Sequence, residues 1–160
     1  MASSLSRKTP PSYLTAEEYL EFVCNVREMK NPKQKIKFWF DYLDFRQKDM
    51  LCKDLSRGAK QKLLVAQAFL HDPKLVLVDE PLVNMDPISH KKVRDYFANF
   101  VKKGNTIFLS THVLDEADRL CKEAALIGMG KIIESGKISG LKKSKKETLE
   151  EVFLRLFMKK

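Results

Sequence analysis

Several features are scarce in this sequence of 160 residues. No apolar run approaches the roughly 18 residues that would cross a bilayer, and the N-terminus has no apolar segment of the secretory type. The three cysteines are odd in number and lack C-x-x-C spacing, which argues against a disulfide framework or a zinc site and favours a reducing compartment. No glycine precedes Gly58, so the residues before it cannot contain a phosphate-binding loop of the form G-x-x-x-x-G-K-[ST].

The charge is one-sided, with a formal net charge of +9. Such a balance could attract nucleic acid or an anionic membrane. Most of the lysines are spread along the chain, and no aromatic residue is interleaved with the local run Lys142, Lys143, Lys145 and Lys146. We therefore favour a solvated linker for this run, and a frayed terminus over a targeting segment for the Ser-rich stretch Met1–Lys8. The length and the 44% apolar composition predict one domain or part of one.

The first half of the chain is expected to be helical. Thr15-x-x-Glu18 is a capping box, and Asn31-Pro32 is typical of the start of a second helix. Ser56 is the expected N-cap of a third helix that ends before Asp72-Pro73. The predicted apolar faces of these helices are Tyr19, Phe22, Val23 and Val26 in the first, Ile36, Trp39, Phe40 and Leu43 in the second, and Ala59, Leu63, Ala66 and Leu70 in the third.

From Lys74 the pattern changes to that of a parallel sheet. Leu75–Val78 is a continuous apolar run, which predicts a strand covered on both faces. Asp86-Pro87 should cap the next helix, and a second strand follows at Thr106–Ser110, so that strand, helix and strand form a right-handed crossover. Short strands around Gly128 and Gly130 and a final helix opened by the capping box Thr148-x-x-Glu151 complete the prediction.

Two places in this pattern suggest chemistry. The helix start at Ser56 and Gly58 could bind a phosphate through its free N–H groups, although a serine there is ordinarily only a cap. Asp79 and Glu80 follow a buried strand, where ligands bind in open α/β sheets, and the alternative is a turn-forming Asp-Glu-Pro. His112 follows the next strand and should emerge at the same edge.

Taken in order, these motifs resemble the distal half of an ATP-binding cassette (ABC) ATPase domain of the drug-exporter or ABC-2 type. The segments that carry the resemblance are Leu55-Ser56-Arg57-Gly58 with Gln61, Asp79-Glu80-Pro81, Asn84-Met85-Asp86-Pro87 and Ser110-Thr111-His112. The resemblance implies an α/β fold, a partial P-loop NTPase in which a helical subdomain precedes a parallel sheet flanked by helices and the P-loop strand and helix are missing. It divides the chain into a helical subdomain (13–54), a core (55–136) and a basic linker with a C-terminal helix (137–160).

The resemblance also implies a role for each site residue. Asp79 would hold Mg²⁺ through water, Glu80 would orient and deprotonate the attacking water, and His112 would be the switch histidine. Ser56, Gly58, Gln61 and Asp86 would contribute to ATP binding, Asp86 in the loop that crosses to the partner subunit. ATP and Mg²⁺ are expected only with a P-loop supplied by a partner, so hydrolysis by this chain alone is not expected.

The sequence is consistent with three functions. The chain is a remnant or split ATP-binding subunit of an exporter, a non-catalytic module that docks on an ABC transporter, or a soluble ABC protein acting on nucleic acid. The first is preferred, with a membrane subunit and another cassette as partners, dimerisation when functional, no specific nucleic acid, and a cytoplasmic location at the inner face of the membrane. Without a P-loop strand, the Leu75–Val78 strand is expected to have an open edge.

Overall fold

The computed structural model describes residues 2–5 and 9–158. The chain forms two compact units, Met1–Ser110 and Thr111–Lys160. The first contains, in chain order, β1 (Ala2–Leu5), α1 (Ala16–Val26), α2 (Pro32–Tyr42), α3 (Arg57–Phe69), β2 (Leu75–Asp79), α4 (Pro87–Lys102) and β3 (Thr106–Ser110). The second contains α5 (Leu114–Leu120), β4 (Glu123–Gly128), β5 (Lys131–Lys137), α6 (Ile138–Leu141) and α7 (Leu149–Phe157). The predicted three-part division of the chain stays a prediction.

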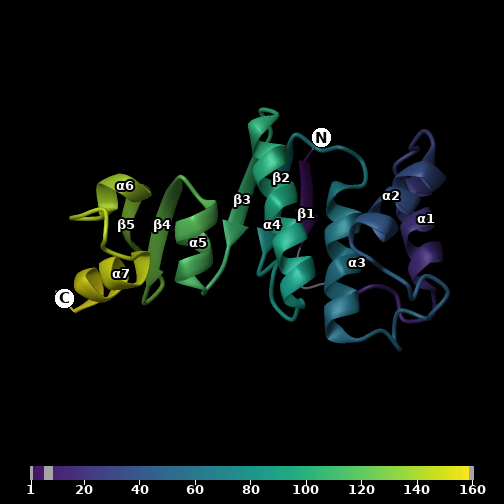
Figure 1. The fold of residues 1–160 in the computed structure, drawn as a ribbon, viewed down its shortest axis with the longest axis horizontal. Helices are drawn as coiled ribbons and strands as arrows, with labels where there is room; N and C mark the ends of the chain where they lie inside the picture. Colours follow the sequence, from purple (N-terminus) through teal and green to yellow (C-terminus); the bar gives the residue numbers. More distant parts are fainter. Residues whose placement is uncertain (1, 6–8, 159–160) are drawn as a thin grey trace. The chain divides into compact units, whose positions relative to one another are not determined.

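The first unit is built on a parallel sheet with the strand order β1-β2-β3 (Figure 1). The expected open edge of β2 is wrong, because Ala2–Leu5 pairs in register with residues 75–78. A frayed terminus is therefore also wrong for these four residues, while residue 1 and residues 6–8 lie outside the described part of the chain. The terminal strand satisfies backbone N–H and C=O groups of β2 that would otherwise lack partners.

One face of this sheet is covered and the other is not. Val76 and Val78 are fully buried, whereas their neighbour Leu77 is 44% exposed and its register partner Phe108 on β3 is 67% exposed. The prediction that the strand is covered on both faces is therefore wrong for the described residues. An apolar run alone does not say whether a second layer is present. The two exposed side chains, each at the middle of its strand, give the sheet an apolar face.

The helices largely begin and pack as predicted. The capping box at Thr15 and the N-caps at Ser56 and Asp86 are confirmed, whereas Asn31 makes no side-chain cap bond. Aromatic rings join α2, α3 and α4, with the Trp39 and Tyr96 centroids 4.6 Å apart. The predicted face of α1 is partly wrong, since Phe22 and Val26 are 54% and 67% exposed.

His71, which follows α3, makes a pH-dependent contribution to stability. Arg27 Nη1 donates to its Nε2 over 2.8 Å. Burial first, and then the charge of Arg27, lower the pKa of His71 to about 4. Because the unfolded histidine binds its proton more tightly, stability is expected to fall as pH drops from about 6.5 towards the folded pKa. The urea midpoint of unfolding should decrease between pH 7 and pH 4.5, and this decrease should be smaller in His71→Gln than in the wild type. An equal decrease in the two proteins would contradict this expectation.

The second unit is a hairpin packed with three helices. β4 and β5 are antiparallel and joined at Met129-Gly130, both with positive φ as in a two-residue type I′ turn. The predicted capping box at Thr148 is present at the start of α7. The core consists of Leu126, Ile138, Leu149 and Val152. Across both units, no helix in the described part of the chain is both long and apolar enough to cross a membrane.

Candidate functional site

The two predicted acidic residues lie at the carboxyl end of β2, next to the end of β3. Asp79 Oδ1 accepts a hydrogen bond from the Ser110 hydroxyl at 3.0 Å, and the Glu80 amide donates to the Ser110 carbonyl at 2.9 Å. Glu80 is buried and has a φ of 48°, a left-handed conformation that is uncommon for a residue other than glycine. The chain therefore turns sharply at the end of β2, and β3 holds that turn.

Gln61 on α3 holds the same turn from the other side. Its amide nitrogen donates to the carbonyl of Glu80 at 3.2 Å and to the carbonyl of Pro81 at 2.9 Å. Both contacts are to backbone, so Gln61 positions the segment that carries Glu80. Its predicted part in cofactor binding stays a prediction.

Ser56 caps the helix that carries Gln61. Its hydroxyl accepts from the Ala59 amide at 3.1 Å, and its side chain is exposed at the start of α3. The helix start thus has the form that phosphate binding requires, and the same contact is an ordinary N-cap. Its role towards ATP stays a prediction.

The structure explains why position 58 is a glycine, which the sequence alone did not. A Cβ atom on Gly58 would lie 2.7 Å from the backbone oxygen of Asn84. The first turn of α3 therefore packs directly on the segment after Glu80, and only glycine allows this approach. This contact accounts for the glycine without a ligand, so its predicted phosphate contact remains a separate prediction.

Asp86 ends the segment that begins at Glu80. The Ser89 amide and hydroxyl donate to its carboxylate at 2.9 and 2.7 Å, and Lys62 Nζ lies 3.0 Å from Oδ2. These contacts, those of Ser89 foremost, hold the pKa of Asp86 well below its usual range.

Gln61 and Lys62 lie three and four positions after Gly58, so the three residues occupy one face of α3. We name residues 80–86 the acidic loop. Gln61 contacts this loop at Glu80, Gly58 contacts it at Asn84, and Lys62 contacts it at Asp86. The contacts of Lys62 and Asn84 were not predicted.

Asp79 and Ser110 offer the oxygen ligands that Mg²⁺ takes in proteins. A magnesium ion in a nucleotide site is usually held by one or two carboxylates, with phosphates and water as the other ligands. No cluster of three or more His, Cys, Asp or Glu side chains that could hold a metal occurs in the described ranges. The single carboxylate beside a hydroxyl therefore fits magnesium held jointly with a nucleotide. In that arrangement Asp79 would hold the ion.

His112 belongs to the second unit, in the segment between β3 and α5. Its side chain is exposed, and it stands two residues before the start of α5. Its predicted role as a switch histidine stays a prediction.

Several known proteins are similar to this chain in sequence or fold. The family model for ABC transporters matches residues 5–83. An ABC transporter ATP-binding protein of Nostoc sp. is 30% identical over 134 residues, which cover 81% of this chain and 40% of the relative. One from Methanocaldococcus jannaschii is 31% identical, covering 78% and 48%. The Nod factor export ATP-binding protein I of Neorhizobium galegae is 35% identical over 88 residues, covering 55% and 25%.

A solved structure of the ATP-binding subunit of an ABC transporter superposes with a TM-score of 0.88. It is 24% identical and covers 98% of this chain and 68% of that one, so it shows the fold. The predicted α/β fold, a partial ABC fold, is confirmed. The chain belongs to the ABC transporter ATP-binding family. It spans about two fifths of the length of the first curated relatives it matches, with 40%, 37% and 42% of three of them covered.

Proposed function

We propose that this chain supplies three parts of an ATPase that drives an ABC exporter: the start of α3 at Ser56 and Gly58, the acidic pair Asp79 and Glu80, and the switch histidine His112. The P-loop of this ATPase would come from outside these 160 residues. The observation that carries the proposal is the set of contacts from α3 and β3 that fix Asp79 and Glu80 at the end of β2. Asp79 would hold Mg²⁺, Glu80 would deprotonate the attacking water and His112 would contact the γ-phosphate. Export is supported by the relatives named for Nod factor export.

The open face of the sheet is the proposed contact for the P-loop portion. Leu77 and Phe108 are exposed register partners, and they lie on the two strands that end at Asp79 and Ser110. A segment packed on that face would therefore bring its phosphate-binding loop close to the acidic pair. The curated relatives have length to supply such a segment, because most of each lies outside its match to this chain.

Phe108→Glu should weaken binding of the P-loop portion by about tenfold or more, because it places a charge in an apolar contact. The partner in this test, here called the P-loop segment, is a polypeptide that contains the loop G-x-x-x-x-G-K-[ST] with its flanking strand and helix, taken from an intact ABC ATP-binding cassette. Binding is measured by fluorescence anisotropy of the labelled segment. Ile132→Glu is the matched control, since Ile132 is 65% exposed and lies on the other unit. Equal affinities for the two variants would contradict the contact.

The proposed partners also include a membrane subunit and a second cassette. The helical region before α3 exposes the large apolar side chains of Tyr13, Phe22 and Val26, at 77%, 54% and 67%. These residues are suited to contact a membrane subunit, so the chain would be held at the inner face of the membrane through that partner. The same residues favour the second candidate, a docking module without catalysis.

Nucleotide binding tests the proposal. A fluorescent ATP analogue with Mg²⁺ should bind the mixture of the wild-type chain and the P-loop segment. It should bind more weakly when the Asp79→Asn chain replaces the wild-type chain in that mixture. The control is a P-loop segment in which the P-loop lysine is replaced, and the mixture that contains it should also bind the analogue more weakly. Binding that does not change when Asp79 is replaced would favour the docking module.

A further inference from the structure

Lys62 on α3 is a largely buried lysine that none of the sequence motifs explains. Its side chain is only 17% exposed, although lysines lie mostly in solvent unless they are paired. Its Nζ lies 3.0 Å from Oδ2 of Asp86, and Asp86 is the N-cap of α4. Lys62 therefore joins α3 to the start of α4, at the end of the acidic loop.

The acidic loop has a backbone that its surroundings must hold in place. Glu80 and Asn84 have φ of 48° and 65°, left-handed conformations that cost free energy in residues other than glycine. Gln61 donates to the carbonyl of Glu80. Gly58 packs on the carbonyl of Asn84. The helix α3 thus contacts the loop at each of its two left-handed residues, and such conformations persist only where neighbouring structure imposes them.

The ion pair between Lys62 and Asp86 is better suited to positioning than to stability. Asp86 is 48% exposed, and pairs between partly solvated charges contribute little to the free energy of folding. The Ser89 amide and hydroxyl also donate to its carboxylate, at 2.9 and 2.7 Å. These contacts of Ser89, and after them that of Lys62, lower the pKa of Asp86, so the carboxylate is charged at neutral pH. Lys62 therefore binds a fixed anion and ties α3 to it.

We infer that Lys62 is a positioning residue of the ATPase reaction. Its pairing with Asp86 holds the acidic loop against α3, and so sets the place of Glu80 relative to the start of that helix. The inference rests on the proposed function, in which Glu80 is the base and the start of α3 contacts phosphate. A misplacement of about 1 Å in a reacting group can lower a rate by about 10²-fold, so loss of this tie should slow the reaction.

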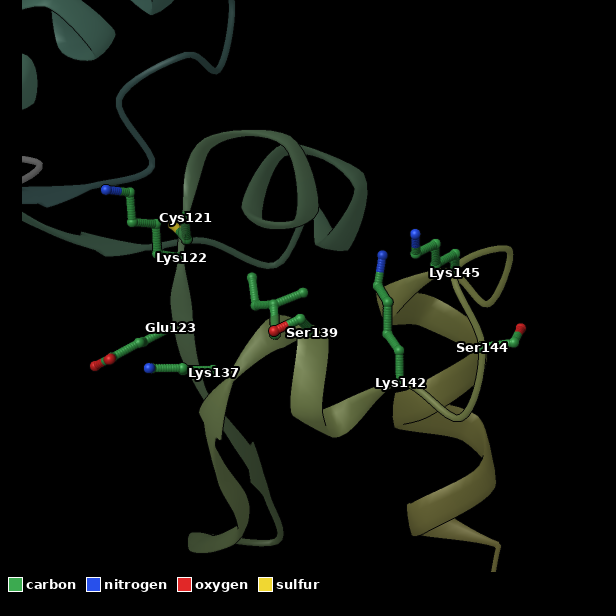
Figure 2. Close-up of a pocket in the computed structure, with 9 residues that line it drawn as sticks. Cys121, Lys122, Glu123, Lys137, Ser139, Lys142, Ser144 and Lys145 are labelled. Atoms are coloured by element: carbon green, nitrogen blue, oxygen red, sulfur yellow. The ribbon is translucent and has the colours of Figure 1, made fainter.

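The test replaces Lys62 with Met in the full chain, which keeps a flexible apolar stem and removes the ammonium group. Lys142→Met is the matched control, because Lys142 is also 17% exposed and its Nζ lies 2.6 Å from Oδ1 of Asp118. Lys142 lines a pocket of the second unit (Figure 2), and no residue of the acidic loop lines it. The two variants therefore remove equivalent ion pairs and the same charge.

Amide hydrogen exchange of residues 80–86 measures the loop in the chain alone. Lys62→Met should speed this exchange by about tenfold, and Lys142→Met should leave it within about twofold of the wild type. Adding Lys62→Met to Asp86→Asn should produce no further increase, because the lysine acts through that carboxylate. Unchanged exchange in Lys62→Met, or an equal increase in Lys142→Met, would overturn the inference.

ATP turnover by the mixture with the P-loop segment measures the reaction. Lys62→Met should lower kcat by about tenfold with KM for ATP within about twofold, and Lys62→Arg should restore most of kcat. A raised KM with unchanged kcat would show that Lys62 contributes to nucleotide binding instead, and would overturn the inference. A wild-type mixture that does not hydrolyse ATP would overturn the proposed function itself. If circular dichroism shows that Lys62→Met is unfolded, Lys62→Gln takes its place in both measurements.

Discussion

Replacing Glu80 with Gln is expected to lower ATP turnover by the mixture of this chain and the P-loop segment by about 10²-fold to 10⁴-fold, the usual contribution of a general base. The backbone of Glu80 is held by Gln61 and Ser110, and these contacts do not involve its carboxylate. The variant should therefore keep these backbone contacts at the end of β2 while it lacks the carboxylate that would accept the proton. Turnover is measured as phosphate release at saturating ATP.

Two comparisons make this result specific. Glu134→Gln removes an exposed carboxylate from β5 in the other unit and should leave turnover within about twofold, as is usual for surface substitutions. ATP binding by the Glu80→Gln mixture should be retained, which shows that chemistry and not binding is lost. If Glu80→Gln hydrolyses ATP as fast as the wild type, Glu80 is not the base.

Gly58→Ala is expected to destabilise the first unit by about 1–3 kcal/mol, the usual cost of forcing an extra methyl group into a packed contact. The new Cβ would lie 2.7 Å from the Asn84 carbonyl oxygen, a backbone atom that cannot rotate away. Alanine is otherwise favoured over glycine within a helix, so propensity alone predicts the opposite sign. The measurement is the free energy of unfolding in urea.

Gly140→Ala is the matched control for this substitution. A Cβ at Gly140, in α6, would meet nothing within 4 Å, so the variant should be as stable as the wild type or slightly more stable. A Gly58→Ala protein that gains stability would show that α3 does not pack on the acidic loop as described. A loss confined to Gly58→Ala would confirm that contact.

Local signals predicted the helix starts well. Thr15, Ser56 and Thr148 each act through atoms within three residues along the chain, so a short stretch of sequence contains the whole interaction. The position of Asp79 at the end of β2 could be predicted for a similar reason, since an apolar run followed by acidic residues marks where a strand ends.

Long-range contacts were beyond this reasoning. Gly58 packs against the backbone of Asn84, and Gln61 donates to the backbone carbonyls of residues 80 and 81. These contacts depend on the distance between α3 and the sheet, which a local sequence pattern does not determine. The strand Ala2–Leu5 was missed because backbone pairing with β2 forms it, and its short sequence has no strong strand pattern. The exposure of Phe22 and Phe108 likewise depends on which elements pack beside them, and the apolar periodicity of the sequence does not predict those neighbours.

Asp79 and Glu80 are expected to act only on a nucleotide whose phosphates are held by a P-loop from outside these residues. The most direct measurement is the ATP hydrolysis rate of the wild-type chain, alone and with the P-loop segment. We predict no hydrolysis above background for the chain alone, and hydrolysis in the mixture that is lost in Glu80→Gln. Turnover by the chain alone, abolished by Glu80→Gln, would contradict the claim.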